Sequence, residues 1–89
     1  MNECFFIGKI IINNGFKFIL NKKNKSKIEM KIKLADENIL KIIAYDEKAD
    51  FIFRNNFNLN DIVFVQGKLR KKDKELVIII NYIEKVGKK

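Results

Sequence analysis

The sequence predicts an all-β protein that folds as one small barrel or sandwich spanning residues 1–89. Its apolar residues are mostly Ile, Val and Phe, in short runs separated by polar clusters about every ten residues. There is no proline, and no segment keeps a helical period over a long stretch. A chain of 89 residues is also the size of one domain and too short for two hydrophobic cores.

The first half of the chain is expected to form three strands. The first covers residues 3–12, with Gly8 marking a bend or a close backbone approach, and residues 13–15 interrupt it before extended structure resumes at 16–20. After a polar loop at 21–26, apolar and charged residues alternate strictly over 27–34. The third strand covers residues 39–45. Its residues Leu40, Ile42 and Ala44 are expected to point inward, and Ile39, Lys41, Ile43 and Tyr45 outward.

The second half is expected to contain one short helix and two strands. Asp46 is a candidate N-terminal cap for the helix, and Ala49, Phe53 and Phe57 are expected to close one end of the barrel. The remaining strands are expected at 62–69 and 76–86, joined by a basic turn at 70–75. The predicted order is therefore three strands, a short helix between strands 3 and 4, and two strands.

This order is that of the five-stranded OB-fold barrel, and three segments resemble the bacterial single-stranded DNA-binding protein family. Residues 2–10 are similar to the opening strand of that family, residues 41–50 to its third strand entering the helix, and residues 59–69 to its fourth strand. The length is similar to that of the tail-less relative primosomal replication protein N. The sequence departs from the family in having no tryptophan, a short connection at 70–75, and Asn60 where glycine is usual.

Charge is unevenly distributed along the chain, which carries a formal net charge of +8. Residues 17–33 contain seven lysines and one acid, residues 36–61 contain three basic and six acidic residues, and residues 68–75 contain five basic and two acidic residues. A codon bias towards lysine would not separate two basic blocks by an acidic one. The pattern favours a basic face for an acidic partner, although charge alone does not distinguish nucleic acid from an anionic membrane.

The resemblance implies a single-stranded DNA-binding site that combines cations with base-stacking rings. It assigns the stacking aromatic of the third strand to Tyr45 and a basic and aromatic pair to Lys17 and Phe18. The period of two places Lys27, Lys31 and Lys33 on the outward face of the neighbouring strand. The full expected nucleic-acid-binding set is Lys17, Phe18, Lys22, Lys23, Lys25, Lys27, Lys31, Lys33, Lys41, Tyr45, Arg70, Lys71 and Lys72.

Other readings of these features remain open. The strand lysines could form a solvated face, and outward Ile39 and Ile43 could mark an oligomer contact or the docking surface of a protein-interaction subunit that binds no nucleic acid. Cys4 is expected to be a small buried filler, and Phe5, Phe6, Phe53, Phe57 and Phe64 are expected in the core.

Catalysis is not expected. The chain has no histidine, a single cysteine and no glycine-rich phosphate loop, so no enzyme site, metal or cofactor is predicted. Neither a signal peptide nor a membrane span is expected. The sequence therefore predicts a cytoplasmic protein that binds single-stranded DNA without sequence preference, and it leaves RNA open as a second ligand. The resemblance further implies a dimer or tetramer.

Overall fold

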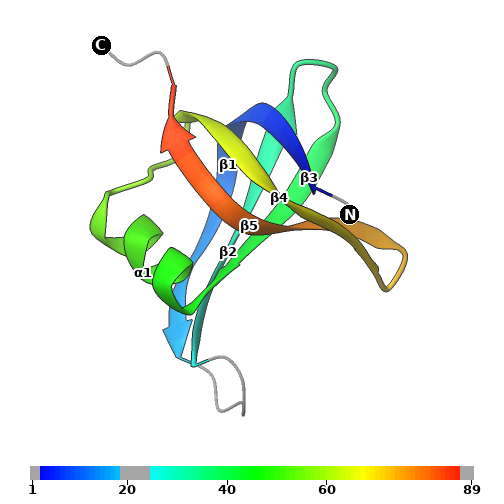
Figure 1. Ribbon diagram of the computed structural model, residues 1–89. Coiled ribbons are helices and arrows are strands. Elements are labelled where there is room, and N and C mark those ends of the chain that lie inside the picture. The colour runs from blue at the N-terminus through cyan, green and yellow to red at the C-terminus, as the bar shows by residue number, and fades with distance from the viewer. Residues whose placement is uncertain (1–2, 19–24, 87–89) are drawn as a thin grey trace.

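The computed structural model describes residues 3–18 and 25–86, and it confirms a closed five-stranded barrel (Figure 1). The strands lie around the barrel in the order β1-β2-β3-β5-β4, in which only β3 and β5 are parallel. One helix stands between the third and fourth strands. The elements are β1 (Glu3–Phe18), β2 (Ser26–Leu34), β3 (Ile39–Tyr45), α1 (Asp46–Arg54), β4 (Ile62–Lys72) and β5 (Glu75–Lys85).

β1 closes the barrel because it pairs with two neighbours in succession. Residues 3–9 pair with β4, and residues 8–18 pair with β2. The changeover occurs at Gly8, where an added Cβ would lie 2.9 Å from the carbonyl oxygen of Lys33. The close backbone approach expected at Gly8 is thus confirmed.

The expectation that residues 13–15 interrupt the first strand is wrong. β1 continues through them with register shifts against β2 between Ile10 and Ile12 and between Asn13 and Phe16. The side chain of Asn13 compensates locally, because its Oδ1 accepts a hydrogen bond of 2.8 Å from the backbone N–H of Gly15. Irregular pairing of this kind bends a strand without ending it.

The core lies inside the barrel, as the alternating pattern predicts. Leu40, Ile42 and Ala44 point inward from β3 and are buried. The other strands contribute residues of the same alternating kind, and all of them are buried: Ile10, Ile28, Met30, Ile32, Val63, Val65, Ile78, Ile80 and Ile83.

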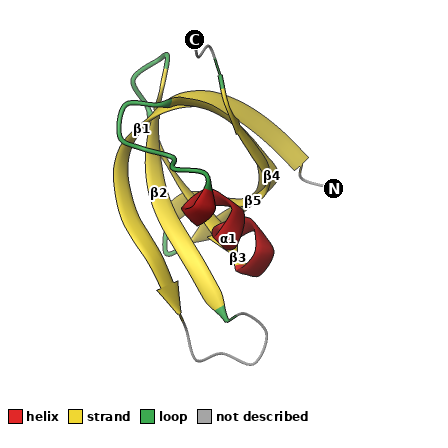
Figure 2. Cartoon of the chain, turned by 90° about the vertical axis from the view of Figure 1, so that its left-hand side faces the viewer, coloured by secondary structure: helices red, strands yellow, loops and turns green. Residues whose placement is uncertain are grey.

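α1 packs against the end of the barrel near the start of β2 and the end of β3 (Figure 2). Ala49 and Phe57 are buried there as expected, but Phe53 is 60% exposed and Ile52 takes the inward position. The capping role expected for Asp46 is also wrong. The helix starts at Asp46 without a side-chain cap. The Oδ1 atom of Asp46 instead accepts hydrogen bonds from the backbone N–H groups of Lys25 and Ser26.

The β4–β5 hairpin is longer and its turn tighter than expected (Figure 1). Asp73 and Lys74 both have positive φ angles, 51° and 68°, which suit a two-residue hairpin turn that matches the twist of its strands. Pairing therefore continues to Lys72 and Glu75, so residues 70–72 belong to β4 and not to a loop.

Candidate nucleic-acid interface

The outer face of β2 and β3 brings together the lysines and the tyrosine predicted from sequence. Across this antiparallel pair, Lys27 lies opposite Tyr45, Lys31 opposite Lys41, and Lys33 opposite Ile39. Side chains two residues apart on a strand share a face, so these residues project from the same side of the sheet. Tyr45 is half-buried, which leaves part of its side chain accessible on that face.

The same face continues onto β5 and β4. Lys41 is level with Val77 and, beyond it, Arg70, while Ile43 is level with Ile79 and then Lys68. We call Ile43, Val77 and Ile79 the apolar strip: Ile43 and Val77 are buried and Ile79 is half-buried. The strip lies outside the barrel interior, on the outer face, between basic side chains.

The surface position expected for Ile43 is therefore wrong. Its side chain is only 2% exposed, whereas Ile39 on the same strand face is 55% exposed. The parallel strand β5 explains this difference in exposure. It pairs with β3 from Lys41 to Ile43, and this pairing places Ile79 beside Ile43. Ile43 is thus not an available oligomer or docking contact.

Acidic neighbours partly neutralise the basic face. Lys41 Nζ lies 3.3 Å from Glu75 Oε1 and 3.6 Å from Glu29 Oε2, and the hydrogen bond to Glu75 raises the pKa of Lys41 above its ordinary value. Lys33 Nζ lies 3.0 Å from Glu37 Oε1.

Lys27 and Lys31 differ from these two lysines. Neither has an ion-pair partner within the described part of the chain. Among the lysines of β2 and β3, they are therefore the two whose charge is most available to an anionic ligand.

The remaining predicted residues are only partly brought to this face. Arg70 shares it, whereas Lys71, the next residue along β4, projects from the opposite side of the hairpin. Lys25 is exposed beside the start of β2. The backbones of Lys17 and Phe18 lie in β1 opposite Lys27 and Ser26, but their side chains, that of Lys72, and all of Lys22 and Lys23 lie outside the described residues.

Lys68 is a candidate that the sequence reasoning missed. It is exposed on β4 and lies level with Ile79 in the apolar strip. Its spacing of two from Arg70 carried the signal, since residues i and i+2 share one face of a strand. Because residues 70–75 are expected to form a turn, the predicted strand ends at residue 69. Arg70 is then not recognised as sharing a strand face with Lys68.

The aromatic expectations need two further corrections, at Phe64 and at Phe5. Phe64 is half-buried and is not part of the core cluster. Phe5 is 66% exposed, so, like Phe53, it is not a core residue. Its ring lies beside that of Phe64 on β4, with a centroid separation of 5.6 Å. Phe6 and Cys4 are half-buried against the core, and the Cys4 thiol donates to the carbonyl oxygen of Gly67 at 3.7 Å.

Within residues 3–18 and 25–86, no group of three or more His, Cys, Asp or Glu side chains is placed to hold a metal ion. Over the same residues, α1 is the one helix, and it is too short to cross a membrane.

Solved structures share this architecture. The single-stranded DNA-binding domain of a Synechococcus protein superposes with a TM-score of 0.82 at 17% identity, covering 94% of each chain. The small single-stranded DNA-binding protein of Streptomyces coelicolor gives 0.80 at 17% identity, covering 96% of this chain and 94% of that one. The dimeric N-terminal domain of PriB from Thermoanaerobacter gives 0.66 at 19% identity, covering 98% of each.

At these identities the likeness establishes the fold. No protein-family model matches the chain, and no curated protein matches it in sequence. The structural neighbours are of the kinds that the sequence resemblance named, namely bacterial single-stranded DNA-binding domains and PriB. The chain has the five-stranded OB fold of these proteins.

Proposed function

We propose that this protein binds single-stranded DNA across the outer face of β2 and β3 without sequence preference. The observation that carries the proposal is the register of this strand pair, which sets Lys27 opposite Tyr45 and Lys31 opposite Lys41 on one accessible face. OB folds that bind single strands combine a cationic groove with aromatic rings on which bases stack. Proteins with this fold include the Synechococcus and Streptomyces single-stranded DNA-binding proteins.

Each part of the face has a distinct role in this proposal. The ammonium groups of Lys27 and Lys31 pair with phosphates, and displacement of counterions makes that term depend on salt. The ring of Tyr45 stacks with a base, a contact that any base can make because every base has a π-face. Lys68 and Arg70 extend the cationic surface across the apolar strip to β4.

An exposed apolar surface on β1 favours self-association as part of the same proposal. Residues 3–7 of β1 pair with β4 alone, because the pairing of β1 with β2 in the described residues starts at Gly8. Phe5 and Ile7 are 66% and 54% exposed along this strand. An apolar strand with one unpaired edge is a template for a further strand. We therefore infer a homodimer in which β1 pairs antiparallel with β1 of a second copy near Phe5, and the dimeric PriB domain shows that the fold accommodates a dimer.

A salt titration tests the DNA-binding proposal. Fluorescent thymidine and uridine oligomers are titrated with the protein at several salt concentrations, and the logarithm of affinity is plotted against the logarithm of salt concentration. Neutralising about five phosphates of a single strand gives a slope of roughly −3.5. If neither oligomer bound the protein at low salt, the DNA-binding proposal would be overturned. The alternative function, a protein-interaction module, would then remain. Equal affinity for the two oligomers would extend the ligand class to RNA.

A further inference from the structure

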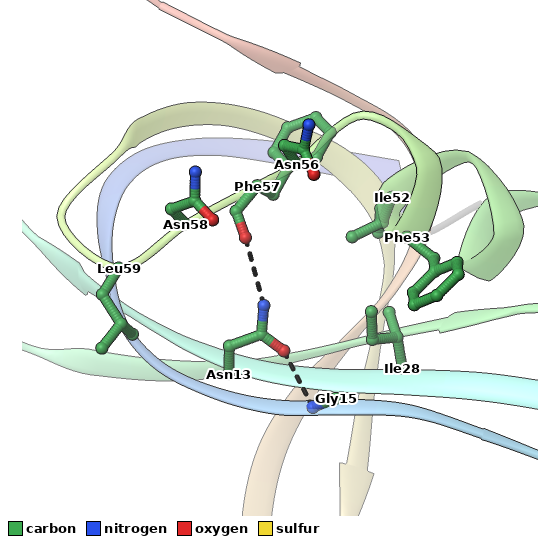
Figure 3. Close-up of a pocket in the computed structure, with 9 residues that line it drawn as sticks. All are labelled: Asn13, Gly15, Ile28, Ile52, Phe53, Asn56, Phe57, Asn58 and Leu59. Atoms are coloured by element: carbon green, nitrogen blue, oxygen red, sulfur yellow. Dashed lines mark hydrogen bonds between the residues drawn. The ribbon is translucent and has the colours of Figure 1, made fainter.

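A pocket of about 400 Å³ opens at the helix end of the barrel, between β1, α1 and the connection that follows α1 (Figure 3). One side is formed by β1, with Asn13 and Gly15, and the other by the connection from α1 to β4, with Asn56 and Asn58. None of these residues belongs to the DNA-binding face proposed above.

The floor and one wall of the pocket are apolar. Ile28, Ile52 and Phe57 are each no more than 5% exposed, and they form an apolar base to the pocket. Phe53 lines the pocket from the last turn of α1 with its side chain 60% exposed (Figure 3). A ring at the mouth of an apolar pocket offers a flat surface to a flat ligand.

The polar groups at the rim are carboxamides. The side chains of Asn56 and Asn58 are exposed and make no hydrogen bond to any described residue. A carboxamide offers a donor and an acceptor side by side, which is the arrangement that pairs with the edge of a nucleobase and in particular with adenine. None of the described residues that line the pocket is acidic.

Hydrogen bonds join the two sides of the pocket and fix the connection that forms one of them. Asn13 Nδ2 donates to the carbonyl oxygen of Phe57 at 3.2 Å, and so ties β1 to the opposite wall (Figure 3). The connection is also fixed by the backbone N–H of Asn60, which donates to the carbonyl oxygen of Ile10 at 2.8 Å, and by Asp61, whose Oδ2 accepts from the N–H of Asn58 at 2.8 Å. A preformed pocket spends little free energy on ordering when it binds.

We propose that this pocket binds one unstacked nucleobase, with adenine the best match. The base would stack on Phe53 and present its polar edge to Asn56 and Asn58. The ligand class follows from the combination of a flat apolar wall, an apolar floor and paired donors and acceptors, which suits a planar heteroaromatic ring better than a peptide or a phosphate.

The pocket is placed to act on a strand that is already bound, and this part of the inference rests on the proposed function. Lys27 and Ile28 are consecutive residues of β2. Lys27 projects onto the outer face beside Tyr45, whereas Ile28 lines the pocket. A strand leaving the face at Lys27 therefore passes the end of the barrel where the pocket opens, and one of its bases can turn into it.

The neutral nucleoside deoxyadenosine tests the pocket separately from the DNA-binding face, because it has no phosphate for the lysines to bind. It is titrated into ¹⁵N-labelled protein and followed by two-dimensional NMR. Saturable shifts are expected for the Gly15 backbone amide and for the side-chain amides of Asn56 and Asn58. Shifts confined to residues around Tyr45, or no shifts, would overturn the proposal that the pocket binds a nucleobase. Neither of these two outcomes would contradict the salt-dependent binding of thymidine oligomers, which tests the proposed function separately.

Variants give a second readout. Thymidine oligomers with and without one central adenine are compared, and the wild type is expected to prefer the adenine-containing strand by roughly fivefold or more, the discrimination that one good pair of hydrogen bonds to a base edge provides. Phe53→Ala and Asn58→Ser should remove the preference while leaving affinity for plain thymidine oligomers unchanged. Asn14→Ser, which alters an exposed asparagine of β1 outside the pocket, should keep the preference. An unaltered preference in Phe53→Ala and Asn58→Ser, with folding verified by thermal melting, would also overturn the proposal.

Discussion

Lys41 on β3 donates to Glu75 on β5, with 3.3 Å between Nζ and Oε1. Glu29 on β2 lies on its other side at 3.6 Å. The most central lysine of the proposed DNA-binding face is therefore already paired with carboxylates contributed by both neighbouring strands. Partly exposed pairs of this kind add little stability, but they do reduce the charge that a phosphate meets.

Removing one of these carboxylates should strengthen DNA binding. In Glu75→Gln, Lys41 keeps only Glu29, and the face gains up to one further phosphate contact. The slope of log affinity against log salt concentration should steepen by up to about 0.7, with tighter binding at low salt. Fluorescence anisotropy with a thymidine oligomer measures both quantities.

The matched control is Glu84→Gln, which changes the formal charge equally on β5. Glu84 accepts a hydrogen bond from Tyr82 and lies level with Phe64, away from Lys41. If both variants steepened the slope to the same extent, net charge would account for the effect and the local role of Glu75 would be refuted.

Tyr45 should contribute through its ring and not through its hydroxyl group. Tyr45→Ala is expected to weaken oligonucleotide binding roughly 5- to 150-fold, the range for losing one stacked base, while the salt slope stays unchanged. Tyr45→Phe keeps the ring and should bind as well as the wild type. Weakened binding in both variants, or in neither, would contradict a stacking role.

Gly67 should tolerate no side chain. It is buried in β4, and an added Cβ would lie 2.0 Å from the carbonyl oxygen of Ile79, a backbone atom that cannot turn away. Gly67→Ala is expected to cost more than about 3 kcal/mol, because overpacking against backbone exceeds the usual cost of a crowded core. Thermal unfolding followed by circular dichroism measures the loss.

Gly15→Ala is the comparison for this experiment. Gly15 has a φ of 86° but open space around the Cβ position, so alanine there should cost only about 1–2 kcal/mol for the left-handed backbone. A larger loss at Gly15 than at Gly67 would mean that backbone conformation, and not the close approach of β5, limits these positions.

The proposed dimer should dissociate when charge is placed on its edge. Phe5→Glu puts a carboxylate at an exposed position of the unpaired part of β1, where antiparallel pairing would bring two copies together. Sedimentation velocity at micromolar concentration should show a dimer for the wild type and a monomer for Phe5→Glu. Leu59→Glu, which changes an exposed leucine of the connection before β4 and not of the unpaired edge of β1, should remain dimeric. A wild-type monomer would refute the contact.

The strand faces could be predicted from sequence because a period of two leaves little choice. Apolar Ile28, Met30 and Ile32 alternate with Lys27 and Lys31, and any register that buries the first set exposes the second. The order of strands and helix, and hence the OB fold, followed from the spacing of such runs and from the family resemblance.

Positions where local signals conflict with the fold were predicted less well. Asn13 and Gly15 carry a strong turn signal, yet the long pairing of β1 with β2 absorbs them as an irregularity. Hydrophobicity alone predicts that Phe53 is buried at the end of the barrel. In the structure α1 is oriented so that Ile52 points inward and Phe53 does not. One-dimensional patterns do not show which side of a short helix meets the barrel.

The sequence by itself determined the all-β class, the facing of β2 and β3 and the basic blocks, because these depend on periodicity and composition within short segments. Only the tertiary structure decided that Ile43 is buried, that Lys41 is neutralised by Glu75 and that Phe5 is exposed on an unpaired edge. Each of these depends on which strand lies alongside, and the parallel neighbour that closes the barrel comes from a distant part of the chain.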